Sequence, residues 1–401
     1  MRRGTFSEAA TMNRPISAQV SAPSALAGAA DVRIARIETI PLKVRLDRTA
    51  VGANLKFTHR CAIVTRVYTD AGVIGECFNG GDDELQGAIM RVIADEMTPK
   101  LIGRKVMAIE EAWDLTRAST EPLLRDRRIG LRAQACIDSA LHDAVGKLAG
   151  LPLHVLWGSA LTEVPVIVLG GYYRDWDELK ELAEEVSQLR SAGAAGIKLK
   201  VGGRSPQADA ARARVVRRAG GDVFVLACDA NQGWTRAEAI EFAGRVADLN
   251  LRWFEEPCKW DNDRADMASV RAATKLPISA GQSELSRFGC RDLMAAGSID
   301  ICNFDASWGG GPTEWRRVAA LAQSYNVGVT QHIEPQIGAM LVAGARNGTF
   351  AEALLAWRDP FFDKLIADQR PFNGGKYQLS DQPGWGWSFD TDYLEYARRK
   401  D

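Results

Sequence analysis

The chain has no apolar run long enough to span a bilayer and no surplus of charge of either sign. Its 50 basic residues almost cancel its 51 acidic ones, so it carries no general field that would attract nucleic acid or an anionic membrane. The seven cysteines are scattered and form no CxxC pair, which argues against a disulfide framework and against a zinc knuckle. These absences favour a protein of the reducing cytoplasm whose partner is a small molecule.

The chain of 401 residues is longer than one small domain, and changes in composition and hydrophobic pattern along it indicate its domain boundaries. Residues 1–30 are rich in Ala and Ser, and Pro15 and Pro23 interrupt them, so we expect a flexible tail and not a signal peptide. Residues 31–155 combine alternating runs, such as Val32 to Ile37, with helical spacing, which predicts an α+β domain. Residues 359–401 resume loop and strand character, and we expect them to return to that domain.

The segment 160–358 has a strict rhythm in which short apolar runs alternate with helical patterns. The runs are 164–170, 195–200, 223–228, 251–255, 277–280, 299–304, 327–332 and 349–354. Strands separated by helices form parallel sheets, and eight repeats favour a closed barrel over an open doubly wound sheet. The predicted fold class is therefore α/β, with a (β/α) barrel.

Polar groups end the predicted strands from the second to the eighth. In chain order they are Lys198 and Lys200, Asp229 and Asn231, Glu255 and Glu256, Gln282 and Glu284, Asp305, His332, and Glu352. Any one of them alone is more often a helix cap or a solvated charge. Seven successive strands, however, bring these groups to the same face of a barrel, which is where barrel enzymes carry their chemistry.

Two pairs of these residues predict a metal site and a general base. Asp229 and Glu255 end neighbouring strands, so they present two hard oxygen ligands side by side, which suits Mg²⁺. Lys198 and Lys200 are two positions apart on one face of a strand. The charge of one is expected to lower the pKa of the other towards the range that a general base needs.

A third pair supplies a second acid–base group. Asp305 and His332 end adjacent predicted strands, close enough for the carboxylate to fix the tautomer of the imidazole. Acid–base groups on two sides of a metal site suit removal of the proton next to a carboxylate. The enediolate that results needs the metal and hydrogen-bond donors to stabilise its charge.

In this order the residues resemble the enolase superfamily, and within it the mandelate racemase subgroup. The resemblance covers residues 31–395 and implies a (β/α)7β TIM-like barrel closed by an α+β capping domain made from both ends of the chain. It implies Mg²⁺ as the cofactor and a homo-oligomer. The roles that it implies are Lys200 as base, Lys198 as its pKa-lowering neighbour, Asp229 and Glu255 as metal ligands, Asp305 and His332 as a dyad, and Glu352 as the acid that hydrogen-bonds the substrate carboxylate.

One position departs from the family's pattern. The third metal ligand, normally Glu or Asp, falls on Gln282, whose neutral carbonyl attracts a hard cation less strongly. Glu284, two residues further along, could take over directly or through water. The remaining alternatives are weak metal binding and a pseudoenzyme that has lost activity.

The resemblance favours dehydration of a sugar acid, an aldonate or an aldarate, to a 2-keto-3-deoxy acid. Racemisation or epimerisation and cycloisomerisation share the first step and remain alternatives. A Schiff-base aldolase with Lys198 or Lys200 as nucleophile is a rival on the same barrel, but it leaves Asp229 and Glu255 without a role.

Other polar residues near the predicted barrel mouth are candidates for substrate contact. Tyr172 and Tyr173 end the first barrel strand, Asn231 the third, and Glu334 follows His332. The stretch 52–60 of the capping domain adds Lys56 and His59. Packing aromatics, helix caps and an exposed basic hairpin are the corresponding structural explanations.

Overall fold

The structure is a computed structural model that describes residues 28–398 apart from 82, 175–177, 355 and 369–373. Residues 1–27 of the predicted tail lie outside the described residues. No helix in the described part of the chain is both long and apolar enough to cross a membrane. The seven cysteines all lie in that part, where they are buried and form no disulfide.

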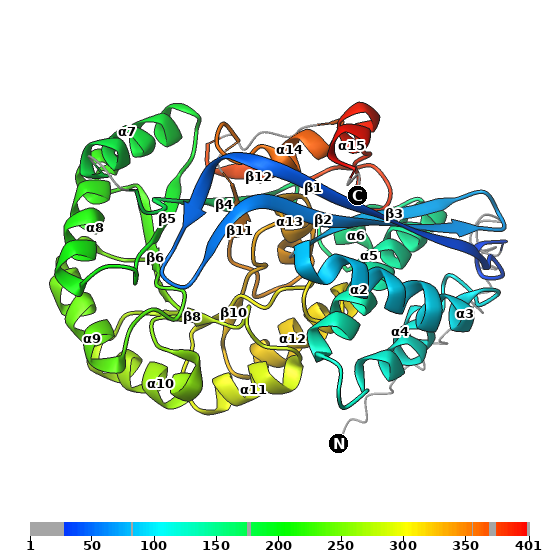
Figure 1. Ribbon diagram of the computed structural model, residues 1–401, viewed down its shortest axis with the longest axis horizontal. Helices are drawn as coiled ribbons and strands as arrows, with labels where there is room; N and C mark the ends of the chain where they lie inside the picture. The colour runs from blue at the N-terminus through cyan, green and yellow to red at the C-terminus, as the bar shows by residue number, and fades with distance from the viewer. Residues whose placement is uncertain (1–27, 82, 175–177, 355, 369–373, 399–401) are drawn as a thin grey trace, which may run out of the picture.

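The first domain is an antiparallel sheet covered by helices (Figure 1). Its strands are β1 (Ile34–Val51), β2 (Lys56–Thr69) and β3 (Ile74–Gly81), and its main helices are α2 (Asp83–Val92), α3 (Thr98–Leu101), α4 (Ile109–Arg117) and α5 (Arg127–Ala149). The long helix α5 begins where the Asp126 side chain accepts a hydrogen bond from Arg128 N and ends at Gly150, whose φ of 68° is left-handed. Both are common helix boundary signals.

The second domain is a parallel barrel, which confirms the predicted fold class. Its strands are β4 (Glu163–Gly170), β5 (Gly196–Lys200), β6 (Val225–Asp229), β7 (Phe254–Glu255), β8 (Ile278–Ala280), β9 (Ile301–Cys302), β10 (Gly328–Val329) and β11 (Ala351–Ala353). They are hydrogen-bonded in the order β10-β9-β8-β7-β6-β5-β4-β11. A parallel bridge between Val329 and Gly348, just before β11, closes the ring.

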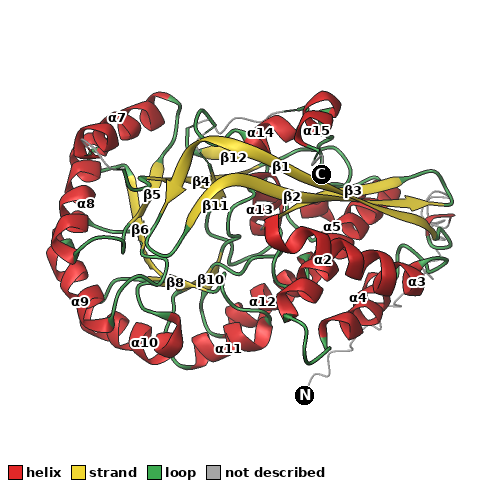
Figure 2. Ribbon diagram, in the orientation of Figure 1, coloured by secondary structure: helices red, strands yellow, loops and turns green. Residues whose placement is uncertain are grey.

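Helices cover the outside of this barrel (Figure 2). They are α7 (Glu178–Ser191), α8 (Pro206–Gly220), α9 (Arg236–Arg245), α10 (Asp263–Thr274), α11 (Arg287–Ala295), α12 (Pro312–Ser324) and α13 (Pro335–Ala343). The α8 helix starts with Ser205 as N-cap and Pro206 in its first turn, and α9 starts with a capping box between Thr235 and Glu238. These caps satisfy backbone groups that a helix end leaves unpaired.

The β5 strand shows how the barrel orients its functional side chains. All five of its residues are buried, and Ile197 and Leu199 belong to the main hydrophobic core. Because side chains alternate along a strand, Lys198 and Lys200 point to the opposite face, towards the barrel interior. In the parallel register Lys200 lies beside Asp229, and Asp229 beside Glu255, so the three residues share one level at the end of the barrel.

The two domains meet along the rim of the barrel. The hairpin formed by β1 and β2 reaches from the capping helices to the loops after β4 and β6 (Figure 2). Tyr173 N donates to Val51 O at 2.9 Å, and Asn54 Nδ2 donates to the carbonyl oxygens of Asn231 and Gln232 at 3.1 and 3.0 Å. The capping hairpin is thus fixed to the barrel by its tip.

The C-terminal segment contacts both domains. Its strand β12 (Lys376–Gln378) pairs antiparallel with β4 of the barrel. Its helices are α14 (Phe361–Leu365) and α15 (Thr391–Ala397), and Arg398, after α15, forms a bridge with Leu42 of β1. The segment therefore joins the barrel to the capping sheet.

Candidate active site

A buried lysine lies at the centre of three carboxylates at the C-terminal end of the barrel. Lys198 Nζ lies 2.6 Å from Glu255 Oε1, 2.5 Å from Glu352 Oε1 and 3.8 Å from Asp229 Oδ2. The Lys198 side chain is completely inaccessible to solvent. Burial lowers the pKa of Lys198, but the three carboxylates more than reverse this effect, so the net shift is upward and the ammonium stays protonated.

Lys200 lies on the mouth side of this cluster, one step further along β5. Its Nζ is 2.6 Å from Asp229 Oδ2 and 3.0 Å from Asn231 Oδ1, and it lies 5.8 Å from the ring centre of Tyr172. The positions of the two lysines on one face of the strand predict that Lys198 lowers the pKa of Lys200. In the structure burial and Lys198 do lower the pKa of Lys200, but its contact with Asp229 outweighs them and the net shift is upward.

The predicted dyad lies in the segments that follow β9 and β10. His332 Nδ1 lies 2.8 Å from Asp305 Oδ2, while Asp305 Oδ1 accepts hydrogen bonds from the backbone N–H groups of Ser307 and Trp308 at 2.8 and 3.2 Å. Gln331 Nε2 donates to the same oxygen at 3.2 Å. With Nδ1 bonded to a carboxylate, the Nε2 atom of His332 is the one left for acid–base exchange.

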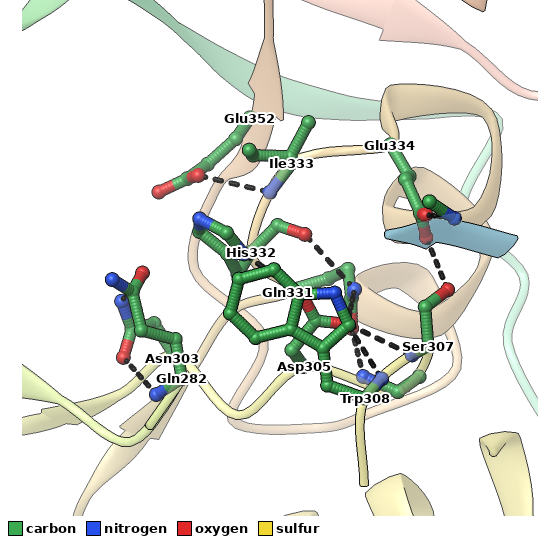
Figure 3. Close-up of polar contacts among 12 residues, drawn as sticks. Gln282, Asn303, Asp305, Ser307, Trp308, Gln331, His332, Ile333, Glu334 and Glu352 are labelled. Carbon is green, nitrogen blue, oxygen red and sulfur yellow. Dashed lines mark hydrogen bonds and ion pairs between the residues drawn. The ribbon is translucent and has the colours of Figure 1, made fainter. Parts of the chain in front are cut away.

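The indole of Trp308 lies against the imidazole of His332, with ring centres 5.0 Å apart (Figure 3).

The second oxygens of Glu255 and Glu352, which do not contact Lys198, also accept hydrogen bonds. Glu255 Oε2 accepts from Trp253 Nε1 at 3.1 Å, and Glu352 Oε2 accepts from Ile333 N at 3.0 Å. The second of these bonds ties the carboxylate on β11 to the residue that follows His332.

Gln282 lies beside the cluster, and both ends of its amide have partners. Its Nε2 donates to Glu256 Oε2 at 2.9 Å and its Oε1 accepts from Asn303 Nδ2 at 3.2 Å. Among the described residues, no group of three or more His, Cys, Asp or Glu side chains is arranged to hold a metal ion. The third predicted metal position therefore supplies an amide oxygen and no third carboxylate.

Glu284 does not join this set. Its Oε1 accepts from Arg264 Nη2 on α10 at 2.8 Å, and its Oε2 packs so closely on Gly289 of α11 that a Cβ there would lie 1.9 Å away. The carboxylate thus lies between two outer helices. The prediction that Glu284 replaces Gln282 as a ligand does not agree with this geometry.

Glu256 is a buried carboxylate that the sequence argument left without a role. Its oxygens accept from Gln282 Nε2, from Ser283 Oγ at 2.8 Å and from Gln232 Nε2 at 3.1 Å. Simple alternation places Glu256 opposite Glu255, on the outside of the barrel. A left-handed backbone, with φ of 37°, instead turns it along the rim, and this turn has no signal in the sequence except the Pro257 that follows.

The predicted substrate contacts separate into two groups. Asn231 and Tyr172 lie next to Lys200. Tyr173 instead donates through its hydroxyl to Asp209 at 2.8 Å and lies under the guanidinium of Arg212. It therefore holds the start of α8 and does not face Lys200.

The remaining three predicted contacts belong to the capping side of the site. Lys56 is exposed at the start of β2, and the ring of half-buried His59 lies 2.9 Å from Thr58 Oγ1. Glu334 is buried between the domains, where it accepts from Gly80 N at 2.5 Å and from Ser307 Oγ at 2.6 Å. A cavity of about 450 Å³ lies under the β1 end of the hairpin, with Tyr172 in its wall.

Comparisons with known proteins agree with the two-domain architecture. A family model described as the mandelate racemase / muconate lactonizing enzyme N-terminal domain matches residues 36–158, and one described as enolase C-terminal domain-like matches residues 181–393. A crystal structure of a mandelate racemase/muconate lactonizing enzyme from a marine actinobacterium, in complex with magnesium, is 46% identical. It superposes with a TM-score of 0.86 and covers 92% of this chain and 100% of that one.

Two relatives of named activity are more distant. The chain is 29% identical over 344 residues to an arabinonate dehydratase of Saccharolobus solfataricus, which covers 83% of this chain and 90% of the relative. It is 28% identical over 389 residues to a D-galactarolactone cycloisomerase of Agrobacterium fabrum, which covers 92% of this chain and 100% of the relative.

Proposed function

The chain belongs to the mandelate racemase/muconate lactonizing enzyme family of the enolase superfamily, and from that premise we propose that it is a Mg²⁺-dependent dehydratase of a sugar acid. The observation that carries this proposal is the position of two acid–base groups at one rim of the barrel. Lys200 ends β5 and His332 follows β10, and these strands are separated by β4 and β11 on one side and by β6 to β9 on the other. A substrate between them has an acid–base group on each face.

The charge of the cluster fits a divalent cation. Asp229, Glu255 and Glu352 surround the ammonium group of Lys198, Asp229 also contacts that of Lys200, and Glu256 adds a fourth buried carboxylate nearby. Burial raises the pKa of Glu255 to about 8 against the charge of Lys198, and the charges of Asp229 and Glu352 add to the rise. Such a surplus of negative charge is relieved by a cation, and hard oxygen donors suit Mg²⁺.

In the proposed site Asp229, Glu255 and the carbonyl oxygen of Gln282 would hold Mg²⁺. The ion, when bound, supplies positive charge that stabilises the oxyanion of an enediolate. The magnesium complex of the marine relative supports the presence of this ion.

The side chains of this chain then account for the proton transfers. In this proposal the substrate carboxylate binds near Glu352, with its α-carbon between Lys200 and His332. Lys200 Nζ or His332 Nε2 removes the α-proton, and Asp305 holds the imidazole through Nδ1 while it changes charge. His332, once protonated, donates its proton to the departing β-hydroxyl.

Isomerisation is the second candidate. Two acid–base groups on opposite sides of an α-carbon could also invert its configuration, as a racemase or epimerase does. The cycloisomerase relative aligns along its whole length. We favour dehydration because one relative is named an arabinonate dehydratase and because Asn231 and Tyr172, which can hydrogen-bond hydroxyls, lie next to Lys200.

The test is ¹H NMR of a panel of aldonates and aldarates in D₂O with enzyme and Mg²⁺. Dehydration would produce a 3-deoxy signal from a C3 that carries one proton and one solvent deuteron, whereas racemisation would exchange only the α-proton. An imine formed by Lys198 or Lys200 would be trapped by borohydride. A chelator should abolish turnover and Mg²⁺ should restore it. Turnover that survives the chelator would contradict the metal assignment.

We expect Lys200→Ala and His332→Asn each to reduce kcat by about 10²- to 10⁴-fold, the usual contribution of a positioned acid or base. A suitable control is His154→Asn, which changes a buried histidine whose ring lies beside Met340. Circular dichroism checks the fold of each variant. Near-normal turnover by either site variant refutes the role given to that residue.

A further inference from the structure

We propose that Glu334 is a positioning residue that couples the capping sheet to the His332–Asp305 dyad. The proposal rests on the proposed function only in taking His332 as an acid–base group. Glu334 is 3% exposed, and its carboxyl group lies between the end of β3 in the capping domain and the loop after β9 in the barrel. Figure 3 shows it on the opposite side of the dyad from Gln282.

The capping side of this contact is made by Gly80. Its backbone N–H donates to Glu334 Oε1 at 2.5 Å. A Cβ atom at position 80 would lie 2.7 Å from the same oxygen, which is too close for a normal contact. A side chain at position 80 would therefore displace the carboxyl group from its present position.

On the barrel side, three successive hydrogen bonds connect the Glu334 carboxyl group to the imidazole of His332. Ser307 Oγ donates to Glu334 Oε2 at 2.6 Å, and Ser307 N donates to Asp305 Oδ1 at 2.8 Å. Asp305 Oδ2 in turn lies 2.8 Å from His332 Nδ1. Asn79 of β3 donates to Ser307 Oγ at 2.8 Å, so the capping strand holds both Glu334 and the serine next to the dyad.

The backbone between His332 and Glu334 gives an independent reason to expect coupling. Ile333 and Glu334 have φ values of 54° and 53°, and a β-branched residue in the left-handed region is a costly exception. This pair of residues is held at both ends. Ile333 N donates to Glu352 Oε2 at 3.0 Å, and the Glu334 carboxyl group is bound to Gly80 and Ser307. Release of either end would let the strained peptides relax and move His332.

The contact works in either protonation state of Glu334. Burial raises the pKa of Glu334 to about 8, and the charge of Asp305 adds to the rise. Gly80 N–H needs only an acceptor at Oε1, and the Ser307 hydroxyl can donate to Oε2 or accept from it. A glutamine at position 334 should therefore keep both contacts, whereas an alanine loses both.

The experiment compares Glu334→Ala, Glu334→Gln and Gly80→Ala in the full-length protein. The chain has only four histidines, so the imidazole signals of His332 can be assigned in a ¹⁵N-histidine NMR spectrum by comparison with His332→Asn. We expect Glu334→Ala and Gly80→Ala to shift or broaden the Nδ1–H signal of His332 and to lower kcat about 100-fold, the order of loss expected from a displaced catalytic group. Their KM should change less, and Glu334→Gln should retain most of the wild-type signal and rate.

The matched control is Asp138→Ala. Asp138 on α5 is also a buried carboxylate that joins the two domains, because it accepts from Thr313 N and Thr313 Oγ1, both at 2.8 Å. Its loss should lower the melting temperature without changing the His332 signal. A wild-type His332 signal in Glu334→Ala, with kcat no lower than in Asp138→Ala, would overturn the positioning role. If the wild type converts no sugar acid but the signal still shifts in Glu334→Ala, the proposed function fails and the positioning role stands.

Discussion

At the scale of single residues, the amide at position 282 limits the charge that the cluster offers to a cation. Gln282 donates to Glu256 and accepts from Asn303, so it connects two neighbours without adding negative charge. A glutamate at this position would add that charge but would place a second carboxylate 2.9 Å from Glu256 Oε2 if the side chain did not move.

We therefore expect Gln282→Glu to raise the affinity for Mg²⁺ by about 10-fold, because ligand charge sets the affinity of such sites. The same variant should melt at a lower temperature than the wild type in the absence of metal, because of repulsion from Glu256. Isothermal titration with Mg²⁺ and thermal unfolding with and without the ion measure both effects. Glu284→Gln is the control, since its carboxylate pairs with Arg264. If Gln282→Glu binds Mg²⁺ no more tightly than Glu284→Gln does, residue 282 is not a ligand.

The sequence identifies most polar residues of the candidate site but not where each side chain goes. Strand periodicity places Lys198, Lys200 and Asp229 correctly because their direction follows from alternation along β5 and β6. Glu284 and Tyr173 lie beyond the strand ends, where loop dihedrals set the direction of a side chain. They turn to Arg264 and Asp209, and no local pattern encodes those partners.

At the scale of secondary structure, one side chain binds the tip of the hairpin of β1 and β2 to the barrel. The Asn54 amide donates to two carbonyl oxygens in the loop after β6, next to Asn231 and therefore next to Lys200. Outside the tip, β1 and β2 pair with each other and with β3, Val51 O accepts from Tyr173 N, and Arg60 of β2 forms an ion pair with Asp359.

We expect Asn54→Ala to raise the KM for the substrate several-fold, on the order of the 1 kcal/mol that one or two exposed hydrogen bonds contribute, with little change in melting temperature. Hydrogen exchange of residues 50–57 should become faster in the same variant. Arg36→Ala, at the far end of β1 where the side chain contacts Glu38, is the control. An unchanged KM together with unchanged exchange would show that the tip contact does not order the hairpin.

The order of secondary structure was predictable because each barrel strand is a short apolar run between amphipathic helices. The run 195–200 corresponds to β5 at Gly196–Lys200, and the run 349–354 to β11 at Ala351–Ala353. The pairing of β12 with β4 was not predictable. This pairing joins segments that are more than 200 residues apart in the sequence, and neither segment has a sequence pattern that identifies the strand it pairs with.

At the scale of the whole molecule, the capping domain and the barrel share a buried polar contact at α5 and α12. His142 Nε2 lies 3.0 Å from Thr313 Oγ1, and burial lowers the pKa of His142 to about 3. Burial raises the pKa of Asp138 from 3.8 to about 7. The interface therefore holds a neutral imidazole beside a carboxyl group that resists ionisation.

This contact predicts a pH dependence of stability. A group whose folded pKa is raised contributes stability that is fully present below its unfolded pKa and is lost as the pH rises through its folded pKa. The wild type should therefore lose stability relative to Asp138→Asn between about pH 4 and pH 7, by on the order of 4 kcal/mol at most. His142 stays neutral in the fold over this range and is protonated only in the unfolded chain, so its contribution is the same in both proteins and cancels from the difference. Melting temperatures of both proteins from pH 4 to pH 8 provide the measurement, and a constant difference would contradict it.

The contact between Gly80 and Glu334 has a consequence for evolution and for engineering. A capping domain transplanted from a relative would bring its own residue at position 80, and any side chain there would collide with the carboxyl group of Glu334. Positions 80 and 334 should therefore covary across relatives, with a larger residue in the capping strand accompanied by a shorter one after the histidine. Chimeras built to change substrate range should exchange both positions together.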